Sequence, residues 1–484
     1  MADPDPAPYP RPFDAAALFI AAVLVIGVFV IAALDRVGAP QGFVRALGPA
    51  LALVVSGAVG LGARNADLPS FLAAGRTLDA FRGALALLVL VAGLAVCLYG
   101  QDGRGARASL PFSAAGVVGG LFGLGPLLRR FGATWRSDVI ATRFPGWPTR
   151  AASGLALVAT AALIAYAGFR GATGVLSSVT GIDGPRAEAI VAIAAALGSI
   201  PGGLASLLAS AATGGGALLV MLTAAVFLKG SAEATAISDA AESFPAAAAL
   251  ASAVATGLAA GGLFMLDPPA IASRSVQSSL RSARGALLLC LALGAAIAAI
   301  ATGSTPIGVT NAATDSLSGG AAIAAYLAVV CVGVQGCSRA FGLVLDAPPR
   351  RFPPLASARL ARMRGAQALA IAACVAGTSH LAVDPRAALT AAMAISLAFT
   401  LPLLALAAIP RAGSLAATAA LLTGLAVFLY CLQRPLEPER AAALLASGLA
   451  ASVAALGVGV LVSRFEPKRD IVRRPFESFA DPSG

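Results

Sequence analysis

Residues 126–146 read PLLRRFGATWRSDVIATRFPG and form a basic loop between two apolar stretches, at about 112-128 and 151-180. Runs of roughly 20 apolar residues are long enough to cross a bilayer as helices. The loop and the start of the next stretch carry five arginines, namely Arg129, Arg130, Arg136, Arg143 and Arg150. Loops on the cytoplasmic side of membrane proteins are enriched in such residues, so this stretch predicts a cytoplasmic loop between two transmembrane helices.

The rest of the chain repeats this pattern. Of its 484 residues, 58% are hydrophobic and only 12% are charged, which is far from the soluble average. The spans are predicted at about 14-34, 45-63, 80-100, 112-128, 151-180, 187-208, 213-229, 244-266, 285-302, 319-345, 365-383, 387-409, 412-432 and 441-463. Because a chain inside lipid must satisfy its own backbone polar groups, we expect an all-α polytopic membrane protein with about 14 transmembrane helices.

The basic residues fix an expected orientation. With both termini in the cytoplasm, and with residues at the ends of spans counted with the adjoining loops, 23 of the 34 Lys and Arg lie on that side and nine lie outside. Only Arg170 and Arg339 fall in the interior of spans. The net charge of +11 therefore indicates membrane topology, and we expect no nucleic-acid partner. The N-terminal segment MADPDPAPYPRPFD has no basic region before a short apolar core, so it does not read as a signal peptide.

Other chemistry is sparse. Of the 23 carboxylates, only Asp14 and Glu188 fall within predicted spans, each in the first turn, and none lies deeper, although ion-coupled transporters usually keep an acidic group there. The six cysteines are dispersed without metal-ligand spacing, so we interpret them as small core residues. The chain has no Ser-His-Asp arrangement, phosphate-binding Gly loop or His/Cys cluster, so we expect neither an enzyme nor a cofactor or metal site.

Five segments in order resemble the solute:sodium symporter family, most closely its acetate-permease-like branch. FLAAGRTLDAFRGAL (71–85) is similar to the entry to the first core helix, and the 126–146 loop is similar to the family pattern of spaced Arg, Gly, Thr and Asp. IPGGLASLLASAATGGGALLVM (200–221) has the Gly pair that precedes a helix in relatives. DPPAIASRSVQSSLRSARGAL (267–287) resembles the PHxxxR segment, and Asp346 stands where relatives end a helix with Asp.

The resemblance implies a LeuT-type fold, in which five helices and five more in inverted topology have broken first helices. The implied transporter core is 80-409, with repeats at about 80-229 and 244-409. A cytoplasmic tail with two helices (1-79) would precede it, and two helices with a basic cytoplasmic tail (410-484) would follow. Breaks are expected near Ala92-Gly93, and near Gly257 or Gly261-Gly262 in the second repeat.

The family's cation site is altered in this chain. Its Ser/Thr pair falls on Val330 and Cys331, which offer no side-chain oxygen, and the first core helix reads LLVLVAGLAVCLYG. The remaining implied ion ligands are the carbonyls of Leu88 and Val91, with Cys331 beside them, and Ala92 and Gly93 would line the solute site. The usual sodium site therefore looks degraded, and proton coupling or uniport fits better, with Na+ or H+ left open as coupling ion.

Arg170 is the most informative polar residue within the spans. It lies four residues after Tyr166, where relatives place a Gln near the solute, so the two side chains share one helical face. Together they could bind a carboxylate in a bidentate manner. Alternatively, Arg170 snorkels to the membrane interface, since a buried guanidinium is costly in lipid. Both interpretations stay open.

Three further features have structural interpretations. Arg339 is expected at the inner interface, and the single histidine, His380, is expected to be packed or interfacial, with a proton relay as the alternative. GGLASLLASAATGGG, with Ser206, Ser210 and Thr213, reads as a Gly-rich connection between helices.

Two functions remain. The first is a secondary transporter of a small organic solute, such as a monocarboxylate like acetate, in a bacterial-type inner membrane. The second is a non-transporting sensor or subunit of a membrane complex on the same scaffold. A polar cavity lined by Tyr166 and Arg170 would favour the first, and a core filled with Leu, Val and Ala would favour the second. The sequence does not specify the oligomeric state.

Overall fold

The computed structural model describes residues 12–64, 71, 80–99, 136–228, 285, 288–290, 292–293, 311–345, 356–381, 383–432 and 440–466. Its regular elements are all helical. They are α1 (Pro12–Arg36), α2 (Gln41–Gly62), α4 (Ala80–Tyr99), α6 (Arg136–Arg143), α7 (Trp147–Thr180), α8 (Gly184–Ser199), α9 (Leu204–Leu228), α13 (Ala312–Leu345), α14 (Ala356–His380), α15 (Pro385–Ile395), η3 (Ser396–Thr400), α16 (Leu401–Ala407), α17 (Ser414–Leu432) and α18 (Arg440–Ser463).

Within these residues, nine helical segments are long and apolar enough to cross a membrane. The predicted fold class is therefore confirmed, and the chain is an integral membrane protein. The spans predicted at 112-128 and 244-266, and most of 285-302, lie outside the described residues, as do Gly257 and Gly261-Gly262.

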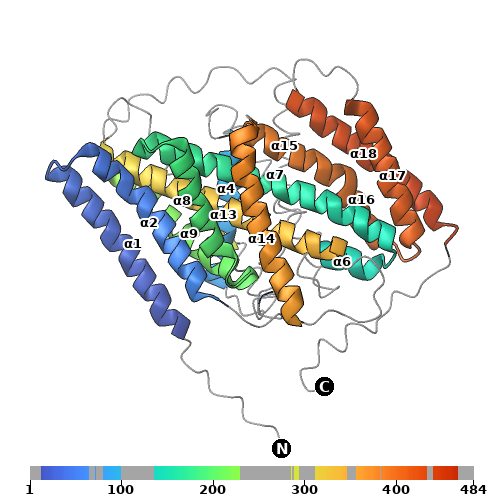
Figure 1. The fold of residues 1–484 in the computed structure, drawn as a ribbon, viewed down its shortest axis with the longest axis horizontal. Helices are drawn as coiled ribbons and strands as arrows, with labels where there is room; N and C mark the ends of the chain where they lie inside the picture. Colours follow the sequence, from blue (N-terminus) through green and yellow to red (C-terminus); the bar gives the residue numbers. More distant parts are fainter. Residues whose placement is uncertain are drawn as a thin grey trace, which may run out of the picture.

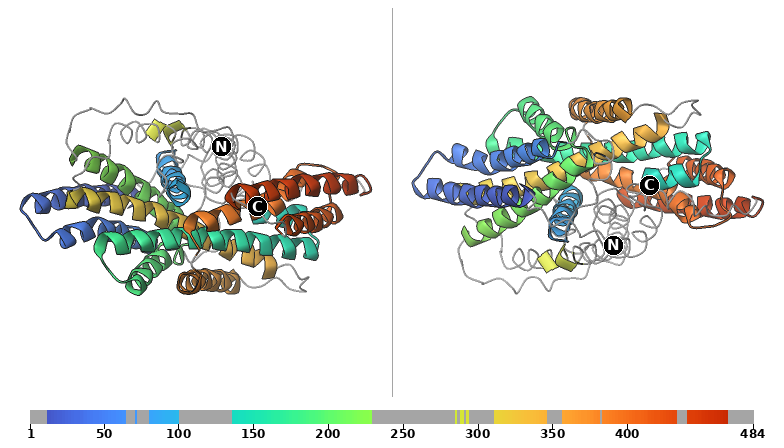
Figure 2. Two further views of the ribbon diagram at one scale, coloured as in Figure 1. Left: turned by 90° about the horizontal axis from the view of Figure 1, so that it is seen from above. Right: turned by 90° about the horizontal axis from the view of Figure 1, so that it is seen from below.

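Helix α13 runs through the middle of the described bundle. Helices α1 and α2 lie at one side and α17 and α18 at the other, in all three views (Figure 1, Figure 2). The apolar part of α13 is 89% buried, whereas that of α1 is only 17% buried. The core is thus built around α13, and α1 is a peripheral helix.

Small residues let α7 and α13 pack closely along their length in antiparallel directions. A Cβ atom on Gly333 of α13 would lie 2.4 Å from the backbone nitrogen of Ala165 on α7. A Cβ atom on Gly168 of α7 would lie 2.9 Å from the backbone nitrogen of Val330, and Gly171 meets the ring of Tyr326. Lipid supplies no hydrophobic drive for helix association, so such close backbone contacts stabilise the pair.

Two helices begin earlier than predicted. Helix α13 starts at Ala312 rather than at 319, because Asp315 in its first turn pairs with Arg45 of α2 at 3.3 Å and Ser316 Oγ accepts the Gly48 N–H at 2.8 Å. Helix α14 starts at Ala356 rather than at 365, so its first three turns contain Arg359, Arg362 and Arg364, which lie outside the predicted span. Both helices therefore begin before the apolar stretch from which each span was predicted.

The segment predicted as one span at 387-409 contains an irregular turn. Helix α15 passes into a π-helical turn, η3, and then into α16, with Pro402 at the start of α16. Proline has no N–H to bond the preceding helical turn, and a single π turn inside an α-helix accommodates such a defect.

The connection between α16 and α17 is held by charges of opposite sign. Arg143, the last residue of α6, donates to the carbonyls of Ile409 (2.8 Å) and Pro410 (3.1 Å). On the other side, the Glu466 carboxylate accepts the N–H groups of Gly413 and Leu415. A cation at the end of one helix and an anion at the start of the next complement the helix dipoles.

Candidate functional site

The turn between α8 and α9 forms the centre of the candidate site. It consists of residues 200–203, and α9 continues from Leu204 through Ser206, Ser210 and Thr213 without a break. The interpretation of GGLASLLASAATGGG as a helix connection is therefore wrong. Gly215 within it instead lets α9 approach α4, since its Cβ would lie 2.2 Å from the Leu85 carbonyl oxygen.

The turn requires glycine at positions 202 and 203 for two different physical reasons. A Cβ on Gly202 would lie 2.0 Å from the Ala63 carbonyl oxygen. Gly203 has φ of +59°, a conformation that favours glycine, and a Cβ there would lie 2.7 Å from the Phe71 ring. Phe71, which is fully buried, also packs with Leu360 and Met363 of α14. Two segments of the family resemblance thus meet here, beside α14.

Helix α14 donates hydrogen bonds to the carboxyl end of α8. The Arg364 guanidinium donates to the Pro201 carbonyl at 3.0 Å and lies 5.8 Å from the Phe71 ring centroid. The Gln367 amide donates to the Ser199 carbonyl at 3.4 Å and to the side-chain carbonyl of Gln335 on α13. The last carbonyls of a helix lack partners within it, so these donors join α8, α13 and α14. We call this cluster of Ser199, Gln335, Arg364 and Gln367 the amide joint. Ser338 lies three residues after Gln335, on the same side of α13.

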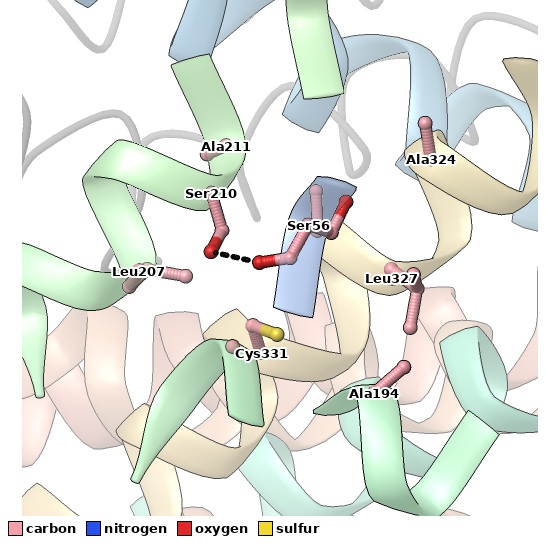
Figure 3. A pocket seen from close by; sticks show the side chains of 10 residues that line it. Ser56, Ala194, Leu207, Ser210, Ala211, Ala324, Leu327 and Cys331 are labelled. Carbon is pink, nitrogen blue, oxygen red and sulfur yellow. Dashed lines mark hydrogen bonds between the residues drawn. The ribbon is translucent and has the colours of Figure 1, made fainter. Parts of the chain in front are cut away.

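A small cavity lies next to the amide joint, between α2, α8, α9 and α13 (Figure 3). Its lining residues include Ser56, Ser210, Cys331 and Gly198. The Ser210 hydroxyl donates to the Ser56 carbonyl at 3.1 Å (Figure 3). The free space is about 10 Å³, which is close to what one water molecule needs. The cavity is lined mainly by Ala and Leu and does not suit an organic solute.

The predicted break in the first core helix is wrong. Helix α4 is continuous from Ala80 to Tyr99, through Ala92 and Gly93. Gly93 instead marks a close helix crossing, because its Cβ would lie 2.4 Å from the Ala325 carbonyl oxygen on α13. The carbonyls of Leu88 and Val91 therefore lie inside a regular helix, and no break frees them for an ion.

Val330 and Cys331 are both buried in α13. The Val330 backbone nitrogen lies close to Gly168 of α7, and the Cys331 thiol lies 4.0 Å from the Ala195 carbonyl oxygen of α8. Their assignment to the family's cation site remains a prediction.

Tyr166 and Arg170 do not form a clamp in this structure. The Tyr166 side chain is buried, and its hydroxyl donates to the carbonyls of Leu381 (2.6 Å) and Val383 (3.2 Å) at the end of α14. Arg170, one turn further along α7, is exposed. The polar end of Tyr166 is thus used by the protein itself, and the predicted solute contact through Arg170 remains untested.

The other predicted polar residues lie apart from each other. Arg339 is buried in α13, and His380 is exposed at the last residue of α14. Five of the six cysteines are buried, Cys431 is partly buried, and all six are free thiols, as interpreted from the sequence. Among the described residues, no cluster of His, Cys, Asp and Glu has the arrangement of a metal site.

The sequence interpretation missed Gln335 and Gln367. The signal was present, because these are the only two of the chain's six glutamines that fall inside predicted spans. A polar side chain inside a membrane helix usually faces the protein interior and bonds another helix. Their pairing across α13 and α14 could not be read from the sequence, since they lie 32 residues apart on separate helices.

Comparison with known proteins identifies the type of fold. Neither a protein-family model nor a curated protein sequence matches the chain. Among solved structures, it is similar to a Na+-coupled sialic acid symporter in a substrate-bound outward-open state. The similarity has a TM-score of 0.68 at 14% sequence identity and covers 90% of this chain and 99% of that one. The chain therefore has the sodium-symporter type of fold that its sequence resemblance implied.

Proposed function

We propose that this protein is a secondary transporter of a small organic solute. It transports the solute without binding sodium at the family's usual cation site. The observation that carries the proposal is the match of nearly the whole chain to a symporter fold. Agreement over 99% of the other chain means that helices at both ends have counterparts, as well as the core. That scaffold is suited to alternating access around a site between its two repeats.

The absence of sodium coupling is proposed from α13 and α4. Val330 and Cys331 offer no oxygen ligand where the family resemblance places two hydroxyls. Helix α4 is continuous where a broken helix would free carbonyls, so the ligands Leu88, Val91 and Cys331 form at most a poor Na+ site. Proton coupling or uniport is the proposed alternative.

A monocarboxylate such as acetate is the proposed solute class. It rests on the sequence resemblance and on Arg170, which is a cation on α7 in a predicted span, 151-180, that contains no carboxylate. Tyr166 is engaged with Leu381 and Val383, so Arg170 alone is proposed to contact the solute. The location proposed is a bacterial-type inner membrane with both termini in the cytoplasm.

A second candidate function is a non-transporting sensor or membrane-complex subunit. One observation favours it: the described contact between α4, α7 and α13 is packed mainly with Ala, Val, Leu and Gly. Such a packed core is what loss of transport would leave on this scaffold.

The test is uptake of labelled acetate, pyruvate and similar acids into proteoliposomes that contain the purified chain. Uptake above that of protein-free liposomes, competed by unlabelled acid, is expected for the transporter. Arg170→Gln is expected to lose uptake of acids, while Arg186→Gln, an exposed arginine near the start of α8, serves as its control. Acid uptake that is unchanged in Arg170→Gln would remove the monocarboxylate assignment, and no uptake of any solute would favour the second candidate.

A further inference from the structure

The amide joint has more hydrogen-bonding groups than its protein partners satisfy. Gln335, Ser338 and Gln367 are fully buried, with 0% of each residue exposed. Their side-chain groups without a protein partner are the Gln335 Nε2, the Gln367 Oε1 and the Ser338 hydroxyl. Buried polar groups are nearly always hydrogen-bonded, to protein or to ordered water, because leaving them unpaired is costly.

The open groups define the chemistry of a ligand. The Gln367 Nε2 already donates to the Ser199 carbonyl and to the Gln335 side chain, so it has no N–H left. What remains is a donor on Gln335 and an acceptor on Gln367, with a hydroxyl on Ser338 that can do either. The ligand must therefore accept one hydrogen bond and donate another.

An ion does not fit these groups. A cation would meet the open Gln335 N–H and lie near two arginines, since Arg364 is three residues before Gln367 and Arg339 is four residues after Gln335. An anion would meet the open carbonyl oxygen of Gln367. The joint lies where α8, α13 and α14 pack against one another, and the groups around it are fully buried. The fitting ligand is small and neutral.

We propose that the amide joint is a buried water-binding site, in which a water molecule accepts from Gln335 Nε2 and donates to Gln367 Oε1. The water completes a hydrogen-bonded link between α13 and α14, next to the link that Gln367 makes to the end of α8. Buried waters of this kind bond about three otherwise unsatisfied groups and are costly to remove. The site is independent of the solute and of whether the protein transports.

The direct test is an experimental structure of the full chain at a resolution that shows ordered waters. The expected result is a water peak within hydrogen-bonding distance of Gln335 Nε2 and Gln367 Oε1, and its loss in the double variant Gln335→Leu with Gln367→Leu. Amide groups that satisfy each other with no peak between them would overturn the proposal, as would a bound ion at that place.

A melting experiment in detergent gives a second readout. Gln335→Leu leaves one N–H of the Gln367 amide without an acceptor and the water without its donor. Gln367→Leu leaves the side-chain carbonyl of Gln335 and the backbone carbonyl of Ser199 without their donor. Each single variant is expected to lower the melting temperature, and the double variant to lose less than the sum of the two, because it removes the unsatisfied groups. The control is Thr390→Val, whose hydroxyl bonds only its own helix, at the Arg386 carbonyl. Additive losses in the double variant would contradict a shared site.

Discussion

Helix α13 contacts α7 with one face and contacts α8 and α14 with another. The two faces are stabilised by different kinds of interaction. The α7 face carries Gly333, with Gly168 and Gly171 opposite, so the two backbones lie close together and exclude polar groups. The other face carries Cys331, Gln335 and Ser338, which lie against the end of α8 and against α14. Close backbone packing at the glycines stabilises the contact between α13 and α7. Side-chain hydrogen bonds, to another side chain and to the end of α8, stabilise the contact of α13 with α8 and α14.

The comparison explains how this chain keeps a transporter scaffold with so few polar residues. In lipid, small residues and interhelical hydrogen bonds both stabilise helix pairs. The glycine contact tolerates no added atom, whereas the amide joint depends on matched donors and acceptors. Substitutions should therefore damage the two faces in different ways.

Gly333→Ala should cause the largest loss. The new Cβ would lie 2.4 Å from the Ala165 nitrogen and 2.7 Å from the Ala161 oxygen, which are backbone atoms that cannot rotate away. Overpacking of this kind costs about 1–3 kcal/mol or more. The measurement is thermal unfolding of the purified chain in detergent.

Gly342→Ala is the matched control for Gly333, because it lies in the same helix with nothing within 4 Å of the added atom. Alanine is about 1 kcal/mol better than glycine in a helix interior, so this variant should melt at the same temperature as the parent or higher. Equal behaviour of the two variants would mean that the close α7–α13 contact is not present in the folded protein.

Arg364→Ala should cost roughly 2 kcal/mol on the second face. It removes a charge-assisted hydrogen bond to the Pro201 carbonyl and the cation–π contact with Phe71. Arg362→Ala, two residues away and exposed, should change stability little. If both variants melt alike, the end of α8 is not held by α14.

Tyr166→Phe and Arg170→Gln distinguish the contributions of two neighbouring side chains on α7 to stability. The first loses the hydroxyl bonds to Leu381 and Val383 and should cost about 1 kcal/mol. The second changes an exposed side chain and should alter stability by less than about 0.5 kcal/mol. A larger stability loss in Arg170→Gln than in Tyr166→Phe would show that Arg170 is buried in the native protein.

The sequence predicted the fold class because about 20 apolar residues suffice for a membrane helix, whatever their partners. It put the break between two neighbouring spans at 209–212, whereas the break lies at 200–203, where Gly203 has a positive φ. It failed at the starts of α13 and α14, where Asp315 pairs with Arg45 and Arg364 binds Pro201, since these contacts join distant segments. The helix break at Gly93 failed for a related reason: glycine serves equally for a break or for a close crossing, and only the position of Ala325 distinguishes them.

Sodium dependence tests the central claim most directly, namely that this scaffold works without the family's cation site. The measurement is initial uptake of labelled acid into proteoliposomes, with external Na+ replaced by K+ at constant ionic strength. The account predicts equal rates in the two salts, because Val330 and Cys331 offer no oxygen ligand and α4 is unbroken at Gly93. Uptake that requires millimolar Na+ and vanishes in K+ would contradict it.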